Sequence, residues 1–268
     1  METADIGLPA MAVLYAVTLL PALLLRAIGL KIARDLGWAI ARMTAQLAIL
    51  GLYLEYLFAL NHPWLNAAWI ALMLIAADLT ILARAGLRWR LFFASTLAAV
   101  SLGVLFSSGY LLGLVIRPQP LYDARYLIPL IGMILGNCLQ SNVIGLERFY
   151  TALRKNQTEY LTYLLLGASR TEAVRPYFRQ AMLASVNPAI ASMATMGLVW
   201  LPGMMTGQIL GGSDPWVAVK YQIAIMLSIL VSMTLTNSLG LWLSLRIAFD
   251  RNDVLRPEIF KPQAVEAR

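Results

Sequence analysis

Charged residues are scarce in this chain: Asp, Glu, Lys and Arg make up 13% of its 268 residues, whereas apolar residues make up 60%. Soluble globular proteins carry about 25% charged residues. A single globule could not bury this much apolar surface without leaving large exposed patches. The composition therefore excludes a soluble enzyme, a nucleic-acid-binding domain and a disordered chain, and it predicts that lipid surrounds most of the protein.

Cysteine and histidine occur once each, as Cys138 and His62. One cysteine excludes an intramolecular disulfide framework, and one histidine excludes a multi-histidine metal cage. The sequence also lacks the Gly-x-x-x-x-Gly-Lys-[Ser/Thr] phosphate loop, and no lysine follows a glycine. We therefore expect no cofactor in this chain and no ATP hydrolysis by the usual loop.

Seven apolar runs are each long enough to cross a bilayer as a helix, which takes about 20 residues. They are too long and unbroken for the ~10-residue alternating strands of a membrane barrel. The sequence thus predicts an all-α integral membrane protein with one transmembrane domain over residues 1–268. The expected spans are 7–30, 38–60, 64–82, 91–116, 126–146, 181–210 and 222–249.

Basic residues alternate between the connections of these predicted spans. Of the 21 Lys and Arg, 18 fall in one set of connections and 3 in the other. Lys and Arg accumulate on the cytoplasmic side of membrane proteins. The sequence therefore predicts an external N-terminus and a cytoplasmic C-terminus, so the pI of 9.7 reports topology and not a nucleic-acid partner.

The longest predicted cytoplasmic connection, residues 147–180, contains several helix-boundary signals. Ser169 followed by Glu172 matches a capping box, and Gly167 can end the preceding helix in a left-handed conformation. Pro176 suits the first turn of a new helix. These signals predict a short helix at about Arg170–Arg175 between two breaks in the helical chain. This segment is either a docking site for a cytoplasmic partner or an ordinary turn at the membrane interface.

A second irregular region is predicted around Pro202 and Gly203. Proline removes a backbone donor and glycine loosens the chain, so we expect a non-helical or sharply bent stretch from Pro202 to Gln208 that faces the bundle or dimer interior. Such breaks can expose carbonyl groups to cargo. Gly203 and Gly207 could equally allow two helices to approach closely.

Polar side chains inside the predicted spans are few, and each leaves two interpretations open. Asp78 is either a functional carboxylate or an interfacial residue paired with Arg84. The amides contact either cargo or neighbouring helices; they are Asn137, Gln140, Asn142, Asn187, Gln208 and Asn237. The methionines of the last two spans could bind soft ions, but we interpret them first as adaptable packing residues.

Two stretches resemble known transporters. Leu166-Gly-Ala-Ser-x-x-Glu-Ala173 is similar to the coupling-helix motif of ABC-transporter permeases. That resemblance implies contact with a cytoplasmic ATPase subunit through Gly167, Ala168, Ser169, Glu172 and Ala173. The match is partial, because the acid expected six residues before the glycine is replaced by Leu161.

The second resemblance is more specific. Gly197-Leu-Val-Trp-Leu-Pro-Gly-Met-Met-Thr-Gly-Gln-Ile-Leu-Gly211, Tyr221-Gln-Ile-Ala-Ile-Met226 and Gly132-Met-Ile-Leu-Gly-Asn137 resemble the FetB-type family of permeases, bacterial iron exporters with plant relatives linked to aluminium tolerance. It implies a permease homodimer in the cell inner (plasma) membrane, with ATP and Mg on a separate ATPase partner. The residues expected in the translocation pathway are Asn137, Gln140, Asn142, Pro202, Gly203, Met204 and Gln208.

The expected function is therefore ATP-driven export of iron or another metal ion, in which this chain is not itself an enzyme. Export of a small organic solute such as a nucleotide sugar is the alternative within the same class. A self-sufficient secondary carrier or channel is the main alternative from another class. A membrane-embedded enzyme is disfavoured, because no cluster of nucleophile, base or metal ligands stands out in the sequence.

Overall fold

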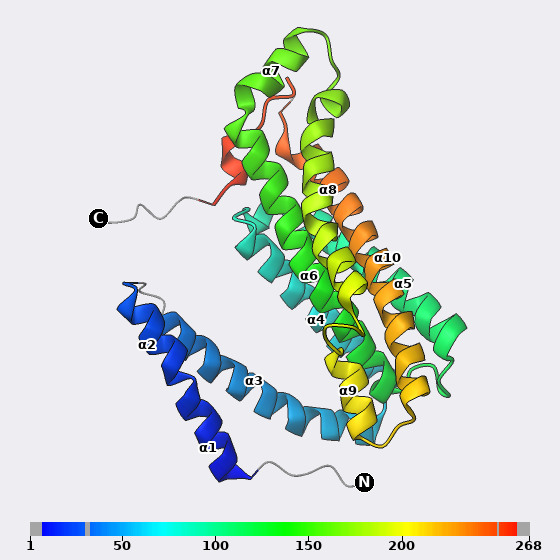
Figure 1. Cartoon of the computed structure of the whole chain (residues 1–268). Coiled ribbons are helices and arrows are strands. Elements are labelled where there is room, and N and C mark those ends of the chain that lie inside the picture. Colours follow the sequence, from blue (N-terminus) through cyan, green and yellow to red (C-terminus); the bar gives the residue numbers. More distant parts are fainter. Residues whose placement is uncertain (1–6, 30–32, 251, 262–268) are drawn as a thin grey trace.

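The computed structural model describes residues 7–29, 33–250 and 252–261, and within these ranges the chain is helical and contains no strand (Figure 1). The isolated bridges in these ranges lie in the connections between helices and in the segment after α10. The elements in chain order are α1 (Leu8–Val17), α2 (Leu19–Ala27), α3 (Ala33–Leu60), α4 (Pro63–Arg84), α5 (Trp89–Tyr110), η1 (Leu111–Ile116), α6 (Ala124–Lys155), α7 (Gln157–Leu165), α8 (Arg170–Thr195), α9 (Gly203–Leu210), α10 (Pro215–Ala248) and η2 (Pro257–Ile259).

Six helical segments in the described part of the chain are long and apolar enough to cross a membrane. They correspond to the predicted spans 1 to 5 and 7. Their bounds are Leu8–Ala27, Arg34–Leu60, Pro63–Arg84, Trp89–Ile116, Ala124–Lys155 and Pro215–Ala248. The chain is therefore an α-helical integral membrane protein, as the composition predicts.

The predicted span 181–210 does not form one helix. Its first part belongs to α8, which ends at Thr195, and its last part is the separate helix α9. Between them, Gly197 adopts a φ of 82° and Pro202 has extended backbone, and neither conformation continues an α-helix. The seven-span count therefore stays a prediction, because this segment differs from the six continuous spans.

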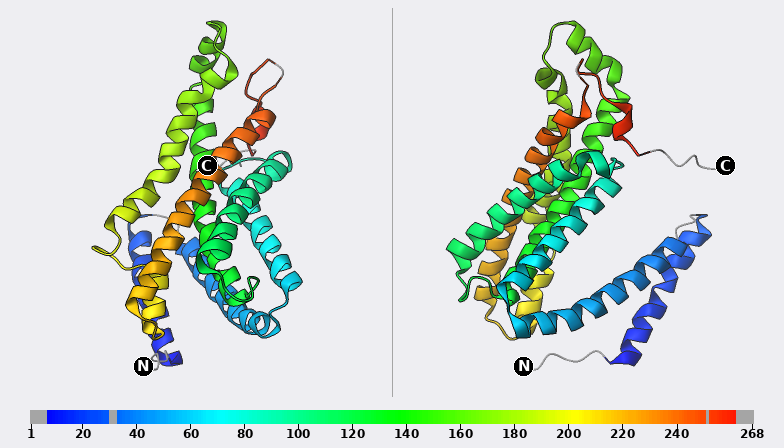
Figure 2. Two further views of the ribbon diagram at one scale, coloured as in Figure 1. Left: turned by 90° about the vertical axis from the view of Figure 1, so that its right-hand side faces the viewer. Right: turned by 180° about the vertical axis from the view of Figure 1, so that it is seen from behind.

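The core of the protein is a bundle of α4, α5, α6, α8 and α10, in which α10 packs against α5, α6 and α8 (Figures 1 and 2). Glycines permit the closest approaches: a side chain at Gly103 of α5 or at Gly145 of α6 would collide with α10. The helices α1 to α3 form a separate arm beside this bundle. No residue of α1 or α2 is buried, so lipid or another protein must cover them.

The connections gather at two opposite ends of the bundle (Figure 1). One end carries the α4–α5 turn, the hairpin formed by α6, α7 and α8, and the segment after α10. The other end carries the α3–α4, α5–α6 and α9–α10 connections. This arrangement separates the same two sets of connections that the basic residues distinguish.

This separation allows a direct test of orientation. With Cys138 replaced by serine, single cysteines at His62 or Lys220 are expected to react with an impermeant maleimide added to intact cells, because the basic residues place these connections outside. A cysteine at Lys155 is expected to react only after the membrane is opened. Labelling at position 155 in intact cells would contradict the orientation.

Candidate functional site

The end of the bundle that carries the most basic residues presents a helical hairpin. Helix α6 continues into α7 after Asn156, and a turn of four residues, 166–169, leads into α8. Gly167 adopts a φ of 91° in this turn, and Ser169 and Glu172 form a capping box. The Glu172 carboxylate accepts hydrogen bonds from the Ser169 backbone at 2.8 Å and from its hydroxyl at 2.7 Å. Both local predictions are confirmed.

These hydrogen bonds have an electrostatic consequence at the helix N-terminus. The Ser169 hydroxyl, and next its backbone N–H, lower the pKa of the Glu172 carboxyl because they stabilise its charged form. A negative charge at this position also opposes the positive end of the α8 dipole. The cap therefore persists at neutral pH and fixes the start of α8.

The predicted short helix at Arg170–Arg175 is wrong. Helix α8 starts at Arg170 as expected, but it continues through Pro176 and Pro188 to Thr195. Both prolines are solvent- or cavity-exposed. Each leaves one carbonyl of the preceding turn without its helical partner, and exposure lets water reach that carbonyl at moderate cost. The short helix in this region is α7 instead, on the other side of the turn.

The tip of the hairpin is apolar and exposed. Leu165 is 87% exposed and Leu166 is 79% exposed, and Gly167 and Ser169 beside them are also at the surface. Of the predicted coupling residues, Ala168 is half-buried and Ala173 is buried against the bundle. A partner could therefore contact the tip and Glu172 but not Ala173.

The segment after α10 holds this hairpin in place. The Arg170 guanidinium forms an ion pair with Asp253 at 3.1 Å, and the Tyr160 hydroxyl donates to the Asp253 carbonyl at 2.7 Å. Burial, followed by the charge of Asp253, raises the pKa of Tyr160 to about 12, so it stays a donor. Residues more than 80 positions apart make these contacts, and no local sequence signal predicts them.

The same segment also contacts the α4–α5 turn. The Lys261 backbone N–H donates to the Gly86 carbonyl at 2.9 Å, and the Arg88 N–H donates to the Ile259 carbonyl at 2.9 Å. We refer to residues 252–261 as the C-terminal clasp. It connects the start of α8 to the turn between α4 and α5.

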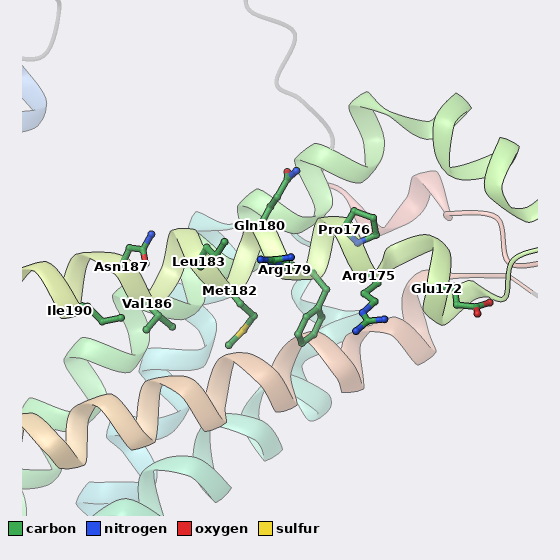
Figure 3. Close-up of a pocket in the computed structure, with 11 residues that line it drawn as sticks. Glu172, Arg175, Pro176, Arg179, Gln180, Met182, Leu183, Val186, Asn187 and Ile190 are labelled. Carbon is green, nitrogen blue, oxygen red and sulfur yellow. The ribbon is translucent and has the colours of Figure 1, made fainter.

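A groove runs along the outer face of α8 away from the tip (Figure 3). Its volume is about 1070 Å³. Glu172, Arg175 and Arg179 line the half nearer the tip, and Leu183 and Ile190 line the apolar half. The change from charged to apolar lining along one helix face is the pattern expected where a helix passes from water into lipid.

A second hollow of about 320 Å³ lies within the bundle between α6, α8, α9 and α10, and we call it the central cavity. It is bounded on one side by the irregular stretch 196–202. Five of the predicted pathway residues line it: Asn137, Gln140, Pro202, Gly203 and Met204. The structure thus brings together residues that are up to 67 positions apart in the sequence.

The break in this region precedes the predicted one. Pro202 is the N-cap of α9, and Gly203 to Gln208 are helical, so the predicted non-helical stretch Pro202–Gln208 is wrong in its location. Proline at a helix start costs no hydrogen bond, which explains why the helix begins there. A side chain built at Gly203 or Gly207 would meet open space, so these glycines do not form a close helix seam within this chain. Gln208 lies outside the cavity lining.

Asn142 also lies outside the cavity and instead connects two helices. Its side-chain amide donates to the Thr236 hydroxyl of α10 at 2.8 Å and to the Cys138 carbonyl at 2.8 Å. Asn237 is buried nearby, and its amide donates to the Ser141 hydroxyl of α6 at 2.5 Å and to the Met233 carbonyl of its own helix at 3.0 Å. For these two amides the geometry supports the interhelical interpretation. Asn187 faces the outer groove on α8.

Replacing Asn142 by leucine is expected to destabilise the bundle by about 1–3 kcal/mol, because the buried Thr236 hydroxyl oxygen loses the donor on α6 and keeps only its own bond to the Met233 carbonyl. The measurement is the thermal unfolding midpoint of the detergent-purified protein. Asn137→Leu is the control, because Asn137 is an exposed residue that lines the cavity, and its side-chain bond among the described residues is to the Met133 carbonyl of its own helix. An equal loss of stability in both variants would contradict this role.

Asp78 does not pair with Arg84. The Arg84 guanidinium donates to the Gln140 amide oxygen at 3.3 Å, whereas Asp78 is fully buried in α4. The interfacial-pair interpretation of Asp78 is therefore wrong. Gln140 connects the cavity to Arg84, a contact that the sequence did not predict.

Several further lining residues of the central cavity were not singled out from the sequence; they are Met133, Ser141, Ser185, Ser192, Trp200 and Gln222. One signal could have found part of this set. Ser185, Pro188 and Ser192 are spaced to share one face of a helix, and a serine–proline face within an apolar segment is typical of a hydrated surface.

The fold and these two features define a polytopic helical membrane protein with an exposed helical hairpin at one end and a hollow of mixed polar and apolar lining between α6, α8, α9 and α10. The model of the "Uncharacterised protein family (UPF0014)" matches residues 8–249, so the chain belongs to this family. The resemblance inferred from the sequence motifs is confirmed.

Relatives occur in bacteria and plants. A UPF0014 membrane protein of Synechocystis is 39% identical over 78% of this chain and 81% of its own length. The "Probable iron export permease protein FetB" of Escherichia coli is 28% identical over 81% of this chain and 82% of its own. The "Protein ALUMINUM SENSITIVE 3" of Arabidopsis thaliana is 26% identical over 95% and 92%. No solved structure matches this chain.

Proposed function

We propose that this chain is the membrane subunit of an ABC exporter in the cell inner membrane, and that it moves a metal ion such as iron out of the cytoplasm. The observation that carries the proposal is the hairpin, whose exposed leucines at 165 and 166 stand next to a fixed helix start at Ser169. An apolar, rigid projection beside charged residues is suited to docking on a soluble protein. The name of the E. coli relative supports iron as the cargo.

In this proposal a separate cytoplasmic ATPase binds ATP and Mg, and this chain supplies no catalytic residue. Two copies of the permease face each other, and the unburied helices α1 and α2 are candidates for the surface between them. The chain crosses the membrane seven times, with α8 and α9 forming the crossing that contains the break. Irregular backbone at that depth is tolerated because it borders a cavity.

The central cavity is the proposed cargo site. Asn137 and Gln140, which line this space between helices, are exposed residues. Broken helices beside a polar cavity are a common way to bind and release cargo in transporters. Helices α6 and α8 both run from the hairpin to the cavity, so in this proposal ATP-driven changes travel along these two helices.

The test is to co-express the chain with an ATPase carrying a Walker motif from the same genome. We expect the two proteins to co-purify, and inverted vesicles to accumulate Fe(II) only when ATP is added. ATP-dependent uptake of a nucleotide sugar instead of any metal would support the organic-solute alternative. Transport by the permease alone, driven by a proton gradient, would contradict the proposal in favour of a secondary carrier.

A further inference from the structure

The lining of the central cavity is rich in sulfur. Met133 of α6, Met204 of α9, and Met226 and Met233 of α10 all border it. Three separate helices therefore contribute thioether groups to one space of about 320 Å³. Met133, Met204 and Met226 are half-buried: they pack against the buried core but keep part of their surface accessible.

An unpaired oxygen also borders this space. Gln222 is 7% exposed and lines the cavity, and its amide oxygen has no hydrogen-bond partner among the residues that the structure describes. Its amide nitrogen is directed to the Met196 sulfur at 3.9 Å. A buried acceptor without a partner costs about 1–3 kcal/mol, so a ligand that accepts its lone pairs would recover this energy.

The net charge of the cavity lining determines which ion charge the cavity can bind at the lowest energetic cost. Every side chain that borders the cavity is neutral at pH 7. A neutral set of ligands at membrane depth stabilises one positive charge at lower cost than two or three. Thioethers prefer soft ions such as Cu(I), whereas carboxylates and other hard oxygen ligands suit harder cations.

From these observations we infer that the central cavity binds a soft monovalent cation of the Cu(I) or Ag(I) class, between the thioethers of Met204 and Met226 and the amide oxygen of Gln222. This inference rests on the proposed permease function: it keeps a metal ion as the cargo but assigns the cavity to a softer class of ion than iron. It assigns an ion-binding role to methionines that the sequence analysis interpreted first as packing residues.

The experiment uses the full-length protein in nanodiscs, with Ag(I) as the probe in chloride-free buffer. Cys138 is replaced by serine, because a thiol would bind silver by itself. We expect about one Ag(I) per chain by equilibrium dialysis, and sulfur neighbours in the X-ray absorption spectrum. The double variant Met204→Leu/Met226→Leu keeps the side-chain volumes nearly unchanged and is expected to raise the dissociation constant at least about tenfold.

The matched control is Met193→Leu/Met205→Leu, since these methionines lie on α8 and α9 close to the lining residues but do not border the cavity. It is expected to bind Ag(I) like the parent protein. Absence of binding by the parent, equal affinity in the Met204/Met226 variant, or a first shell without sulfur would overturn the inference. If the double variant fails to fold, the X-ray absorption spectrum of the parent protein still shows whether sulfur atoms bind the Ag(I) ion.

A further measurement separates this inference from the proposed function. ATP hydrolysis by the permease–ATPase complex is followed with Ag(I) and with Fe(II). Stimulation of ATP hydrolysis by Fe(II) but not by Ag(I) would agree with the proposed exporter function and would contradict the soft-ion site. If the ATPase does not bind the permease but Ag(I) still binds in a methionine-dependent way, the result would contradict the exporter function and support the soft-ion site.

Discussion

Replacing Gly103 by valine is expected to prevent assembly of the helical bundle. A side-chain carbon at Gly103 would collide with the Thr236 methyl group, and it would lie 3.2 Å from the Thr236 backbone nitrogen and 3.4 Å from the Ser232 carbonyl oxygen. A side chain can rotate away from such a contact, but a backbone cannot, so α5 and α10 would have to separate. Overpacking a core costs about 1–3 kcal/mol, and moving two helices apart exceeds that range.

The measurement is the yield of monodisperse protein after size-exclusion chromatography of a fluorescent fusion. Gly109→Val is the control, because Gly109 lies on the same helix and a side-chain carbon there would have no heavy atom of a neighbouring element within 4 Å. Valine has the same intrinsic helix propensity in both variants, so a difference between them reflects packing. Normal yield of the Gly103 variant would show that α5 and α10 do not pack as described.

Changing the hairpin turn is expected to abolish coupling to the proposed ATPase partner without preventing membrane insertion. Gly167 has a φ of 91°, which a β-branched side chain strongly disfavours, so Gly167→Val should displace the exposed tip. Glu172→Lys removes half of the capping box and places a positive charge at the positive end of α8. We expect either change to reduce ATP-dependent transport at least about tenfold, equivalent to about 1.4 kcal/mol of lost interaction.

The readouts are co-purification of the ATPase and stimulation of its ATP hydrolysis. Gly212→Val is the matched control: Gly212 has a φ of 90° and, like Gly167, an unobstructed side-chain position, but it lies in the α9–α10 turn at the opposite end. The Gly212→Val variant has the same kind of backbone strain but leaves the hairpin unchanged. If the Gly167 and Gly212 variants lose ATPase stimulation equally, the hairpin is not the docking element.

The parts of the fold that depend on local patterns could be predicted from the sequence. Long apolar runs correctly indicated six of the spans, and the Ser169–Glu172 pattern and Gly167 correctly marked the start of α8 and the turn before it. These features depend on residues within a few positions of each other, so the physical rules for caps and spans apply directly.

The errors concern proline and long-range contacts. Pro176 and Pro188 do not break α8, because the tertiary packing of buried neighbours such as Val174 and Ala181 holds the helix together. Pro202 starts a helix where a break was expected. Five of the seven residues predicted for the translocation pathway line the central cavity, because the amides and the Pro202–Gly203 pair were visible in the sequence. Their convergence with Gln222 was not visible there.

The C-terminal clasp has a consequence for how the protein is made. Asp253, which anchors Arg170 and Tyr160, leaves the ribosome more than 80 residues after the hairpin that it fixes. Protein synthesis proceeds at about 5–20 residues per second, so several seconds pass between synthesis of the hairpin and synthesis of Asp253. An ATPase that recognises the anchored hairpin would then reject nascent or truncated chains that stop short of the clasp, and the clasp would serve as a check that the bundle before it is complete.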